Sequence, residues 1–313
     1  MKVDVIVPVY RPGQELFALI EQLRMQTVEI GKIIIMNTGE TIFESPEEDK
    51  RFCDTYGALV EIHYIAKESF DHGGTRRLGV SYSDADIFVM MTQDAYPQDS
   101  QLLEHLIQRL EGQVAVAYAR QLPGETSSEF ERISRQFNYP PVSQVKSKED
   151  IATLGIKTFF CSNVCAAYRR DIYDALGGFV EHTIFNEDMI YAAGAVRAGY
   201  QVSYEADAQV VHAHNYTNMQ QLRRNFDLGV SQALHPEVFA EVSSASEGKK
   251  LVQAAYGDMK KNRRLSKLLP FCIQCAYKYV GYLLGKHFRS IPGNWVMKLT
   301  MNQTFWNSQS IYK

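Results

Sequence analysis

One acidic side chain, Asp94, follows an apolar run in the stretch Met90-Met91-Thr92-Gln93-Asp94-Ala95. A carboxylate at this place could hold a divalent cation that bridges a diphosphate, because hard cations prefer oxygen ligands. Such a cation would offset the charge on a departing nucleoside diphosphate. The carboxylate could equally cap the turn or helix that follows, so the residue alone leaves both interpretations open.

A glycine pair precedes a helical pattern in Gly73-Gly74-Thr75-Arg76. Backbone N–H groups at a helix N-terminus, together with a nearby arginine, suit phosphate oxygens. The simpler alternative is a turn that needs the conformational freedom of glycine. The motif indicates a phosphate-binding loop without establishing one.

Two adjacent acids, Glu187 and Asp188, open another helical pattern. One of them could act as a general base that removes a proton from a hydroxyl group. Acids also stabilise the first turn of a helix through its dipole. The spacing does not separate the two residues, so both remain candidates.

Two histidines, His212 and His214, follow a late apolar run. In an extended strand their side chains would share a face, and neutral imidazole is a common metal ligand. One of them could complete a metal site. The alternative for each is a hydrogen-bonded histidine at the end of a strand.

The elements that must position these residues are indicated by apolar periodicity. Short apolar runs rich in β-branched residues alternate with helical patterns over about the first 120 residues. This alternation predicts βαβ units and a mostly parallel sheet in an α/β fold. The predicted strands are Val3–Val9, Ile30–Met36, Val60–Ile65, Ile87–Met91 and Val114–Tyr118, and the predicted helices include Leu16–Met25, Thr75–Ser83 and Leu102–Leu110.

Polar clusters follow four of these strands. Because parallel sheets bind ligands beyond the carboxyl ends of their strands, we expect the clusters to converge on one rim. The clusters are Pro8–Arg11, Asn37–Glu40, Phe70–Arg76 and Thr92–Ala95.

The second half of the chain is less regular. Phe159–Tyr168 is predicted as a strand that includes Ser162 and Asn163, and Gly177 and Gly178 mark a loop. Two further short strands and two helices are predicted, at Val202–Glu205, Ala208–Val211, Glu187–Arg197 and Gln220–Leu234.

The composition is that of a globular protein with one large domain or one domain plus an appendage. Of the 313 residues, 45% are apolar and 22% are charged. The first residues do not have the pattern of a signal peptide, so we expect the five cysteines to be reduced thiols in the cytoplasm. Cys272 and Cys275 have the spacing of a zinc half-site, but no second pair follows, which favours buried thiols.

Charge is distributed unevenly along the chain. Residues 249–313 contain 12 lysines or arginines and one acid, Asp258, whereas residues 1–248 contain 21 basic and 35 acidic residues. A basic tail on an acidic body suggests a polyanionic partner, either nucleic acid or anionic lipid.

The tail contains a mainly apolar segment, Leu268–Leu284, with basic residues on both sides. Pro270, Gln274 and Lys278 interrupt it, and it falls short of the roughly 20 apolar residues that a spanning helix needs. The pattern is typical of an interfacial amphipathic anchor, and the interleaved aliphatic residues favour lipid over nucleic acid. The alternative is a helical subdomain that packs on the body.

These motifs, in this order, resemble glycosyltransferase family 2, and within it the rhamnosyltransferase-like group of bacterial cell-wall and capsule assembly. The resemblance extends over most of the chain. It is carried by Ile6-Val7-Pro8-Val9-Tyr10, Phe70–Arg76, Met91–Ala95, Ser162-Asn163-Val164-Cys165, Leu176-Gly177-Gly178-Phe179, Asn186-Glu187-Asp188 and Val211–Thr217.

The resemblance implies a GT-A fold with a Rossmann-like nucleotide-binding half and a mixed central sheet. It places a catalytic domain at residues 1–245, with a donor half at about 1–120 and an acceptor half at about 121–245. Residues 246–313 would form a helical, basic amphipathic extension that associates with a membrane.

The resemblance also implies roles for individual residues. Asp188 matches the catalytic base, with Glu187 beside it, and Asp94 matches the last acid of the family's Asp-x-Asp motif. The metal ligands would be Asp94 with His212 or His214. The donor would contact Pro8, Val9, Tyr10, Asn37, Asp71, Gly74, Arg76, Gln93 and Asp94, and the acceptor would contact Ser162, Asn163, Gly177 and Gly178.

One departure from the family pattern concerns the metal. Thr92 stands where the first acid of Asp-x-Asp is usual, so the motif supplies one carboxylate. The cation would then rely more on the diphosphate, water and a histidine.

The expected activity is a metal-dependent, inverting transfer of L-rhamnose from dTDP-L-rhamnose to a glycan on a polyprenyl-diphosphate lipid. The expected cofactor is Mg²⁺ or Mn²⁺. The protein is expected in the cytoplasm, peripheral on the inner face of the cell membrane and in contact with its anionic surface, without nucleic acid, and as a monomer or a homo-oligomer. A UDP-hexose donor is one alternative, and a non-catalytic nucleotide- or nucleic-acid-binding protein is an alternative of another class.

Overall fold

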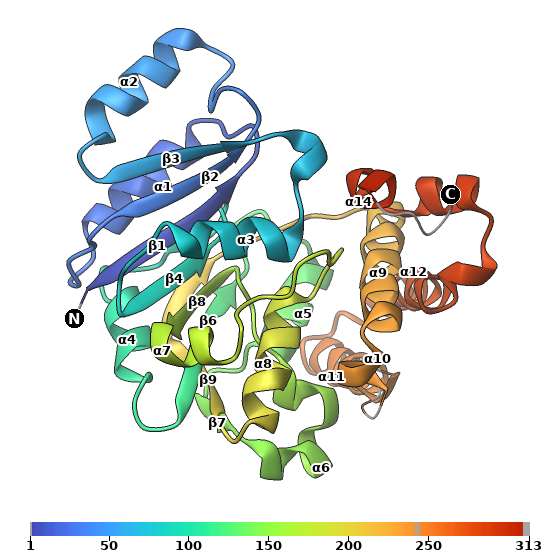
Figure 1. Cartoon of the computed structure of the whole chain (residues 1–313). Coiled ribbons are helices and arrows are strands. Elements are labelled where there is room, and N and C mark those ends of the chain that lie inside the picture. Colours follow the sequence, from blue (N-terminus) through green and yellow to red (C-terminus); the bar gives the residue numbers. More distant parts are fainter. Residues whose placement is uncertain (1, 241, 243–244, 309–313) are drawn as a thin grey trace. The chain divides into compact units, whose positions relative to one another are not determined.

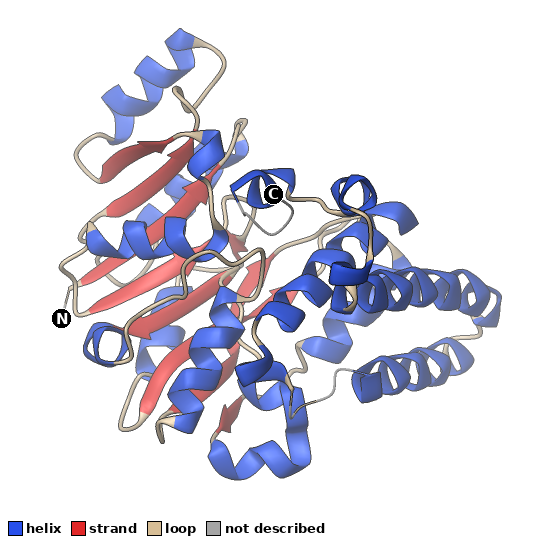
Figure 2. Cartoon of the chain, turned by 45° about the vertical axis from the view of Figure 1, so that its right-hand side comes forward, coloured by secondary structure: helices blue, strands red, loops and turns tan. Residues whose placement is uncertain are grey.

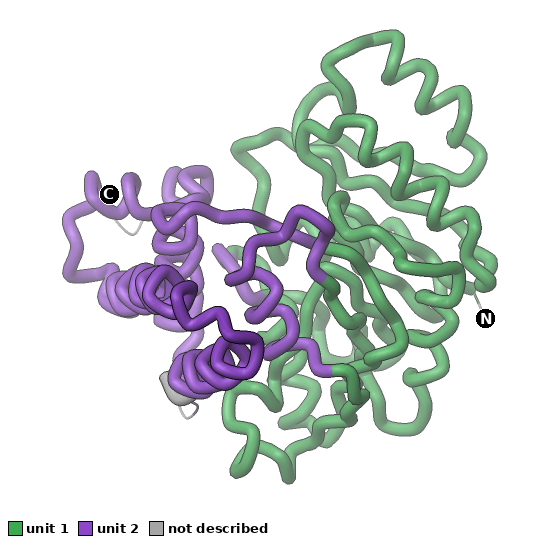
Figure 3. Tube along the Cα trace, turned by 180° about the vertical axis from the view of Figure 1, so that it is seen from behind, with its two compact units in different colours: residues 1–122, 141–182, 187–212 green, residues 123–140, 183–186, 213–313 purple. Residues whose placement is uncertain are grey.

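A computed structural model describes residues 2–240, 242 and 245–308 of the chain. The chain forms two compact units, which Figure 3 distinguishes by colour. The first unit comprises residues 1–122, 141–182 and 187–212, and the second comprises residues 123–140, 183–186 and 213–313. Residues 309–313, at the end of the predicted extension, lie outside the described part.

The first unit is built on one nine-stranded sheet (Figures 1 and 2). The strand order is β3-β2-β1-β4-β8-β6-β9-β5, and β7 pairs with β9 at one side. The strands are β1 (Val3–Val9), β2 (Ile33–Thr38), β3 (Val60–Ile65), β4 (Ile87–Met91), β5 (Tyr96–Pro97), β6 (Val114–Leu122), β7 (Gln144–Lys146), β8 (Cys165–Arg169) and β9 (Gln201–Val211).

The sheet is mixed, and the directions of its strands decide which loops lie at the same edge. β1, β2, β3 and β4 are mutually parallel, and β6 is parallel to β9. β8 runs antiparallel between β4 and β6. The carboxyl ends of the parallel strands therefore lie at the same edge as the residues that precede β8. We call this edge the carboxyl edge and the opposite one the amino edge.

Helices cover both faces of this sheet. On one face, alternate apolar residues of β1, β2 and β4 form a buried core with the apolar sides of α1, α2 and α4. In Figure 1, α3, α7 and α8 lie in front of the sheet. The helices of this unit are α1 (Glu15–Arg24), α2 (Pro46–Tyr56), α3 (His72–Ser81), α4 (Leu102–Gln108), α6 (Ile151–Leu154), α7 (Arg170–Ala175) and α8 (Glu187–Arg197), with short 3₁₀ turns at Lys67–Ser69, Lys148–Asp150 and Gly155–Phe159.

The α3 helix approaches the sheet closely at Gly79. A Cβ atom added there would lie 2.7 Å from Ile6 Cγ2 and 3.0 Å from Met36 Cγ. The absence of a side chain at Gly79 therefore allows α3 to lie directly on β1 and β2. This contact sets the distance between the sheet and α3, the helix whose first turn contains Gly73 and Gly74.

The sequence predicted five strands of the first half, and the structure confirms them with small shifts at some ends. The α/β class is also confirmed. Two predictions for the second half are wrong in detail. Ser162 and Asn163 precede β8 instead of lying within it, because pairing with β4 begins at Cys165.

The two short strands predicted at residues 202–211 form one strand, β9, with an irregularity. The register with β6 shifts between Ala119 and Arg120, where Ala119 pairs with Glu205 but Arg120 pairs with Gln209. Buried Glu205 stabilises the extra residues, since its Oε1 accepts hydrogen bonds from Ser143 Oγ (2.8 Å) and from the N–H of Asp207 (2.9 Å). The gap between the two predicted strands falls at this irregularity.

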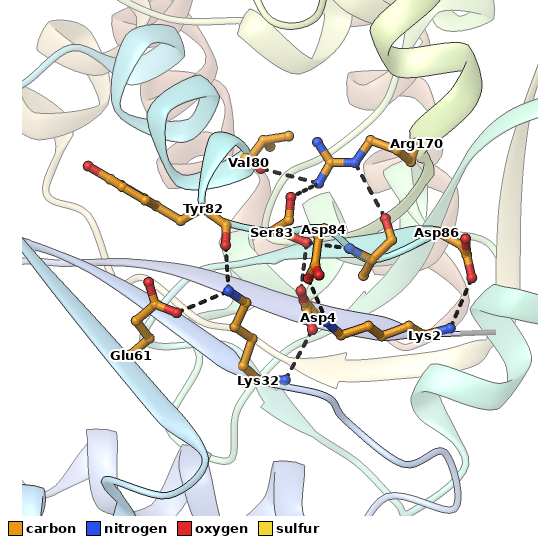
Figure 4. Close-up of polar contacts among 11 residues, drawn as sticks. Lys2, Asp4, Lys32, Glu61, Val80, Tyr82, Ser83, Asp84, Asp86 and Arg170 are labelled. Atoms are coloured by element: carbon orange, nitrogen blue, oxygen red, sulfur yellow. Dashed lines mark hydrogen bonds and ion pairs between the residues drawn. The ribbon is translucent and has the colours of Figure 1, made fainter.

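A dense polar network holds the amino edge (Figure 4). Asp4 on β1 is fully buried and accepts hydrogen bonds from Ser83 Oγ (2.7 Å) and from the N–H of Lys32 (3.1 Å). Arg170 donates to the carbonyl oxygens of Ser83 (2.8 Å) and Val80 (3.2 Å). These bonds link the starts of β1, β2 and β4 to the end of β8.

The second unit is helical (Figure 3). Two of its apolar clusters are centred on Phe226, Phe288 and Trp306, and on Phe130, Met259 and Phe271. Its helices are α5 (Glu129–Asn138), α9 (Asn218–Leu234), α10 (Pro236–Phe239), α11 (Ala245–Lys261), α12 (Leu268–Lys286), α13 (Gly293–Leu299) and α14 (Gln303–Ser308), with 3₁₀ turns at Leu265–Lys267 and Phe288–Ser290.

Helix α12, which contains the predicted anchor, packs along α9 through glycines. A Cβ atom at Gly281 would lie 2.1 Å from the carbonyl oxygen of Leu222, and one at Gly285 would lie 2.0 Å from that of Phe226. The two helix backbones therefore touch. The predicted alternative, in which the tail packs as a helical subdomain, accounts for this side of α12.

The opposite side of α12 is exposed and apolar. Leu269, Ile273, Val280 and Leu283 are all exposed, and their spacing places them on one helical face. Within the described residues, none of the helices is long and apolar enough to cross a membrane. All five cysteines are free thiols, and Cys272 and Cys275 on α12 are half-buried instead of fully buried.

Candidate active site

The carboxyl edge brings together the loops that follow β1 and β4. The N–H of Tyr10 donates to Gln93 Oε1 (2.7 Å), and Gln93 Nε2 donates to the carbonyl oxygen of Tyr10 (3.3 Å). This reciprocal pair closes the gap between two predicted donor-binding segments. The expected convergence of these two loops is confirmed.

Asp94 lies beside His212 at this edge. Asp94 Oδ1 is 3.5 Å from His212 Nε2, and the Asp94 side chain is 38% exposed whereas that of His212 is 6% exposed. A carboxylate and an imidazole at this separation are suitable ligands for one divalent cation. β9 ends at Val211, so both histidines follow the strand instead of lying on it, and His214 belongs to the second unit.

Gln121, at the end of β6, connects His212 to Ser162. Gln121 Oε1 lies 3.1 Å from His212 Nδ1, and Gln121 Nε2 donates to Ser162 Oγ (2.9 Å). Sequence reasoning missed Gln121, because it lies beyond the predicted strand Val114–Tyr118 and belongs to none of the motifs. The pairing of β6 with β9, and of β6 with β8, is the signal that places it between the two.

The two adjacent acids have different surroundings. Glu187 is buried, and its Oε1 lies 3.2 Å from Arg76 Nε in an ion pair between two buried side chains. Burial alone would raise the pKa of Glu187, but the charges of Arg76 and His72 and a hydrogen bond from Asn163 outweigh it and lower that pKa. Glu187 is therefore held as a paired carboxylate.

Asp188 is half-buried and has a raised pKa. Its Oδ2 accepts a hydrogen bond from the N–H of Asn163 (3.0 Å), and its Oδ1 accepts one from the N–H of Met189 (2.7 Å). Burial and the neighbouring charge of Glu187 nevertheless raise the pKa of Asp188 from 3.8 to about 7. A carboxyl group with a pKa near neutrality suits a general base.

Asn163 joins the two acids from the segment before β8. Its Nδ2 donates to Glu187 Oε1 (3.0 Å), and its Oδ1 accepts a hydrogen bond from Tyr168 Oη (2.6 Å). Asn163 was predicted to contact the acceptor, but its side chain is 3% exposed and its amide oxygen and nitrogen both hold internal bonds. These bonds place Asn163 between Glu187 and Asp188.

Asp71 caps the first turn of α3. Its Oδ1 accepts hydrogen bonds from the N–H groups of Gly74 (2.5 Å) and His182 (3.2 Å), and burial raises the pKa of its carboxyl group. The carbonyl oxygen of Asp71 accepts the N–H of Thr75 (2.9 Å). Two N–H groups of the predicted phosphate loop are therefore already bonded within the chain.

Three other predicted donor contacts have distinct environments. The Val9 side chain is buried in the apolar core, so it reaches a ligand through its backbone at most, whereas Pro8 is half-buried. Asn37 is fully buried, and its Nδ2 donates to the carbonyl oxygen of Thr41 (2.9 Å). Its Oδ1 has no hydrogen-bond partner among the described residues.

The backbone conformation after α7 explains the presence of the glycine pair that was predicted to contact the acceptor. Gly177 and Gly178 have φ angles of 81° and 76°, in the left-handed region that favours glycine. A Cβ atom at Gly178 would lie 2.9 Å from the ring of Tyr173. These glycines allow the turn after α7 to fold over Tyr173, whatever their part in binding.

The chain matches the family model described as glycosyl transferase family 2 over residues 4–177. It is 37% identical over 316 residues to the O-antigen chain rhamnosyltransferase RfbN of Salmonella typhimurium, covering 98% of this chain and 97% of that protein. It is 36% identical to the O-antigen chain rhamnosyltransferase WbaN of Salmonella anatum, covering 97% of this chain and 95% of that protein.

Solved structures with a similar fold include the mannosyltransferase PcManGT of Pyrobaculum calidifontis, in complex with GDP-Man and Mn²⁺. The TM-score is 0.63 at 13% identity, with 91% of this chain and 87% of that chain covered. TarS of S. aureus in complex with UDP-GlcNAc has a TM-score of 0.51 at 13% identity, with 92% and 91% covered. At these identities the likeness concerns the fold.

Proposed function

Because this chain belongs to glycosyl transferase family 2 and is a glycosyltransferase with a GT-A-like fold, we propose that it transfers L-rhamnose from dTDP-L-rhamnose. The donor sugar is supported by two relatives named as O-antigen chain rhamnosyltransferases, each covered over nearly its full length. The proposed acceptor is a growing glycan on a polyprenyl-diphosphate lipid. Family membership argues against the non-catalytic alternative.

The observation that carries the proposed mechanism is the contrast between Glu187 and Asp188. Arg76 pairs with Glu187, and this leaves Asp188 as the carboxyl group whose pKa is raised to about 7. At pH 7 and above a large fraction of Asp188 is ionised and can accept a proton. We assign Asp188 as the general base and Glu187, Arg76 and Asn163 as residues that position it.

The reaction is a single displacement. Asp188 takes the proton from an acceptor hydroxyl group, and the hydroxyl oxygen forms a bond to the anomeric carbon of the rhamnosyl group. The bond from that carbon to the β-phosphate oxygen breaks on the opposite face, and its electron pair leaves with dTDP. The configuration at the anomeric carbon is therefore inverted.

A divalent cation fits the ligands at Asp94 and His212. The donor set combines one carboxylate with one buried imidazole 3.5 Å away, and His214 lies two residues further along the chain. When bound, Mg²⁺ or Mn²⁺ would offset the charge that develops on the departing diphosphate. Asp94, His212 and His214 are the proposed ligands.

The remaining proposed donor contacts lie on the first unit. Tyr10 and Gln93 present their linked loops at the carboxyl edge, and Asn37 offers a buried amide oxygen. Pro8, Val9, Asp71, Gly74 and Arg76 stay in the proposed donor set, and Ser162, Gly177 and Gly178 stay in the proposed acceptor set. The donor half at residues 1–120 and the acceptor half at 121–245 also remain predictions.

A panel of nucleotide sugars tests the proposed donor. The protein is incubated with dTDP-L-rhamnose, UDP-galactose, UDP-N-acetylglucosamine and GDP-mannose, with a lipid-linked glycan and Mn²⁺, and release of nucleoside diphosphate is measured. We expect release with dTDP-L-rhamnose to exceed that with each other donor. Faster release from a UDP-sugar would establish the alternative donor class instead.

We further propose that the protein is cytoplasmic and binds the inner face of the membrane through α12. The exposed face of Leu269, Ile273, Val280 and Leu283 supplies apolar area. Basic residues before and after the helix would contact anionic headgroups, namely Lys260, Lys261, Arg263, Arg264, Lys267, Lys286 and Arg289.

Paired substitutions on this face test the membrane proposal without removing the helix. Leu269→Glu/Ile273→Glu should reduce binding to vesicles containing phosphatidylglycerol by about tenfold or more, because it puts charge on the inserted face. Met25→Glu, an equally exposed apolar position in the first unit, is the control and should bind as the parent does. Unchanged vesicle binding of the double variant would contradict the proposal.

A further inference from the structure

Gln121 is a buried amide between two side chains of the candidate site. It is 2% exposed, with its nitrogen 2.9 Å from Ser162 Oγ and its oxygen 3.1 Å from His212 Nδ1. A neutral imidazole has one N–H donor and one acceptor nitrogen, and its partners decide which nitrogen carries the proton. Gln121 is therefore placed to choose the tautomer of His212.

The orientation of the amide selects one tautomer. Because Gln121 directs its nitrogen at Ser162, it presents its oxygen to the ring, and an oxygen there requires a proton on Nδ1. The lone pair of His212 then lies on Nε2, which is the nitrogen 3.5 Å from Asp94 Oδ1. A histidine that binds a metal usually donates its other N–H to an outer partner of this kind.

We propose that Gln121 is a positioning residue that holds His212 as the Nδ1–H tautomer and so presents Nε2, beside Asp94, to the divalent cation. The inference rests on the proposed function, since it concerns the cation of that reaction. It adds a residue outside the metal ligands and outside the motifs that identify the family. Ser162, predicted to contact the acceptor, becomes the anchor of this amide.

The backbone explains why Gln121 can reach His212. The register shift inserts residues 206–208 into β9, so that Gln121 pairs with Val210 and Leu122 with Val211. An insertion of three residues, an odd number, reverses the face on which the following side chains of β9 lie. The N–H of His212 then donates to the carbonyl oxygen of Leu122 (3.1 Å), which fixes the histidine directly past the end of β6.

The tautomer can be measured in the protein without metal or nucleotide. Nitrogen-15 chemical shifts of the His212 ring at pH 8 should show Nδ1–H in the parent protein and in Gln121→Glu, whose carboxylate also accepts from Nδ1–H. Gln121→Leu removes the acceptor, and the Nε2–H tautomer should increase. An Nε2–H ring in the parent protein would overturn the proposal without reference to any variant.

Metal affinity is the second measurement. Mn²⁺ binding in the presence of dTDP, followed by electron paramagnetic resonance, should weaken about 10–100-fold in Gln121→Leu, as is typical for loss of an outer partner. Gln121→Glu should stay within about threefold of the parent. Equal Mn²⁺ affinity in the parent protein and in Gln121→Leu would overturn the proposal.

Three controls separate this result from failure of the proposed function. Asp94→Asn and His212→Ala should both abolish Mn²⁺ binding, and if neither does, the proposed metal site itself is wrong while the tautomer result still stands on its own. Gln108→Leu, on the exposed side of α4, should match the parent in all measurements. Circular dichroism melting of each variant reports whether it is folded.

Discussion

The two edges of the sheet in the first unit each contain a hydrogen-bonded carboxyl group, Asp4 at the amino edge and Asp188 at the carboxyl edge, but the surroundings of the two groups differ. At the amino edge, Asp4 is fully buried and accepts hydrogen bonds from a side chain and a backbone N–H. At the carboxyl edge, Asp188 also accepts two hydrogen bonds, but burial and the neighbouring charge of Glu187 raise its pKa to about 7. Burial together with this like charge prepares the Asp188 carboxyl group to take up a proton.

Asp188→Asn is expected to have the largest effect. The amide keeps the shape of the side chain but cannot accept a proton from the acceptor hydroxyl group, so kcat should fall by about 10²–10⁴-fold. The rate of rhamnosyl transfer is measured, together with dTDP binding by calorimetry, which should be retained. Full activity in this variant would contradict the assignment of the base.

Breaking the ion pair that separates the two acids is expected to have the next largest effect. Glu187→Gln leaves the buried Arg76 charge unpaired, which should cost about 3–5 kcal/mol in the free energy of unfolding. It also removes one of the two causes that raise the pKa of Asp188, while burial remains, so the acidic limb of the pH–rate profile should move part of the way to lower pH. Urea unfolding and kcat from pH 5 to 9 measure the two effects.

An acidic limb that does not move would show that Glu187 has no influence on the base. Glu181→Gln is a matched control, because Glu181 is an exposed acid in the loop before α8 that pairs with Arg77. It should leave both the unfolding free energy and the pH–rate profile close to those of the parent.

Asp4→Asn tests the opposite edge. In this variant an amide nitrogen replaces one of the two acceptor oxygens and would face a hydrogen-bond donor, either Ser83 Oγ or the N–H of Lys32. The free energy of unfolding should therefore fall by about 1–3 kcal/mol. Because Asp4 lies at the amino edge, kcat should stay within about twofold of the parent at a temperature where both proteins are folded. A loss of kcat without a loss of stability would contradict the claim that the amino edge serves stability and the carboxyl edge serves catalysis.

Asp188 is also expected to make the stability of the protein depend on pH. Its pKa is higher in the folded protein than in the unfolded chain, so ionisation of Asp188 opposes folding, and this penalty grows as the pH rises from about 4 to about 7. Asp188→Asn removes the penalty. Its Tm should exceed that of the parent at pH 8, and the difference should shrink towards pH 4.

Much of the first unit could be predicted from the sequence, because its strands are short apolar runs bounded by polar clusters. Asp94, Asp188 and His212 were predicted as candidates because their residue types suit metal binding or proton transfer. The contacts of Gln121 and Asn163 could not be predicted in this way. Their partners are set by pairing between β6, β8 and β9, and a three-residue shift in β9 has no sequence period.

In the second unit, too, the sequence pattern predicted an element without predicting how it packs. The apolar and basic pattern of residues 265–289 predicted an amphipathic segment, but two glycines decide which side of α12 is buried. Gly281 and Gly285 have no apolar side chain, so a hydrophobicity pattern does not count them as core. Their close contact with the α9 backbone is a steric property, visible once the two helices are seen together.

Ser162 and Asn163 are consecutive residues, yet one bonds to Gln121 and the other bonds to both acids. A mutant library aimed at a new donor or acceptor sugar should therefore leave this dipeptide unchanged, since any exchange there would disturb two tasks at once. Tyr10 and Gln93 are better positions to randomise, because their loops meet at the exposed side of the same edge. For an engineer, Ser162 and Asn163 therefore belong to the fixed scaffold, and the loops of Tyr10 and Gln93 form the adjustable surface.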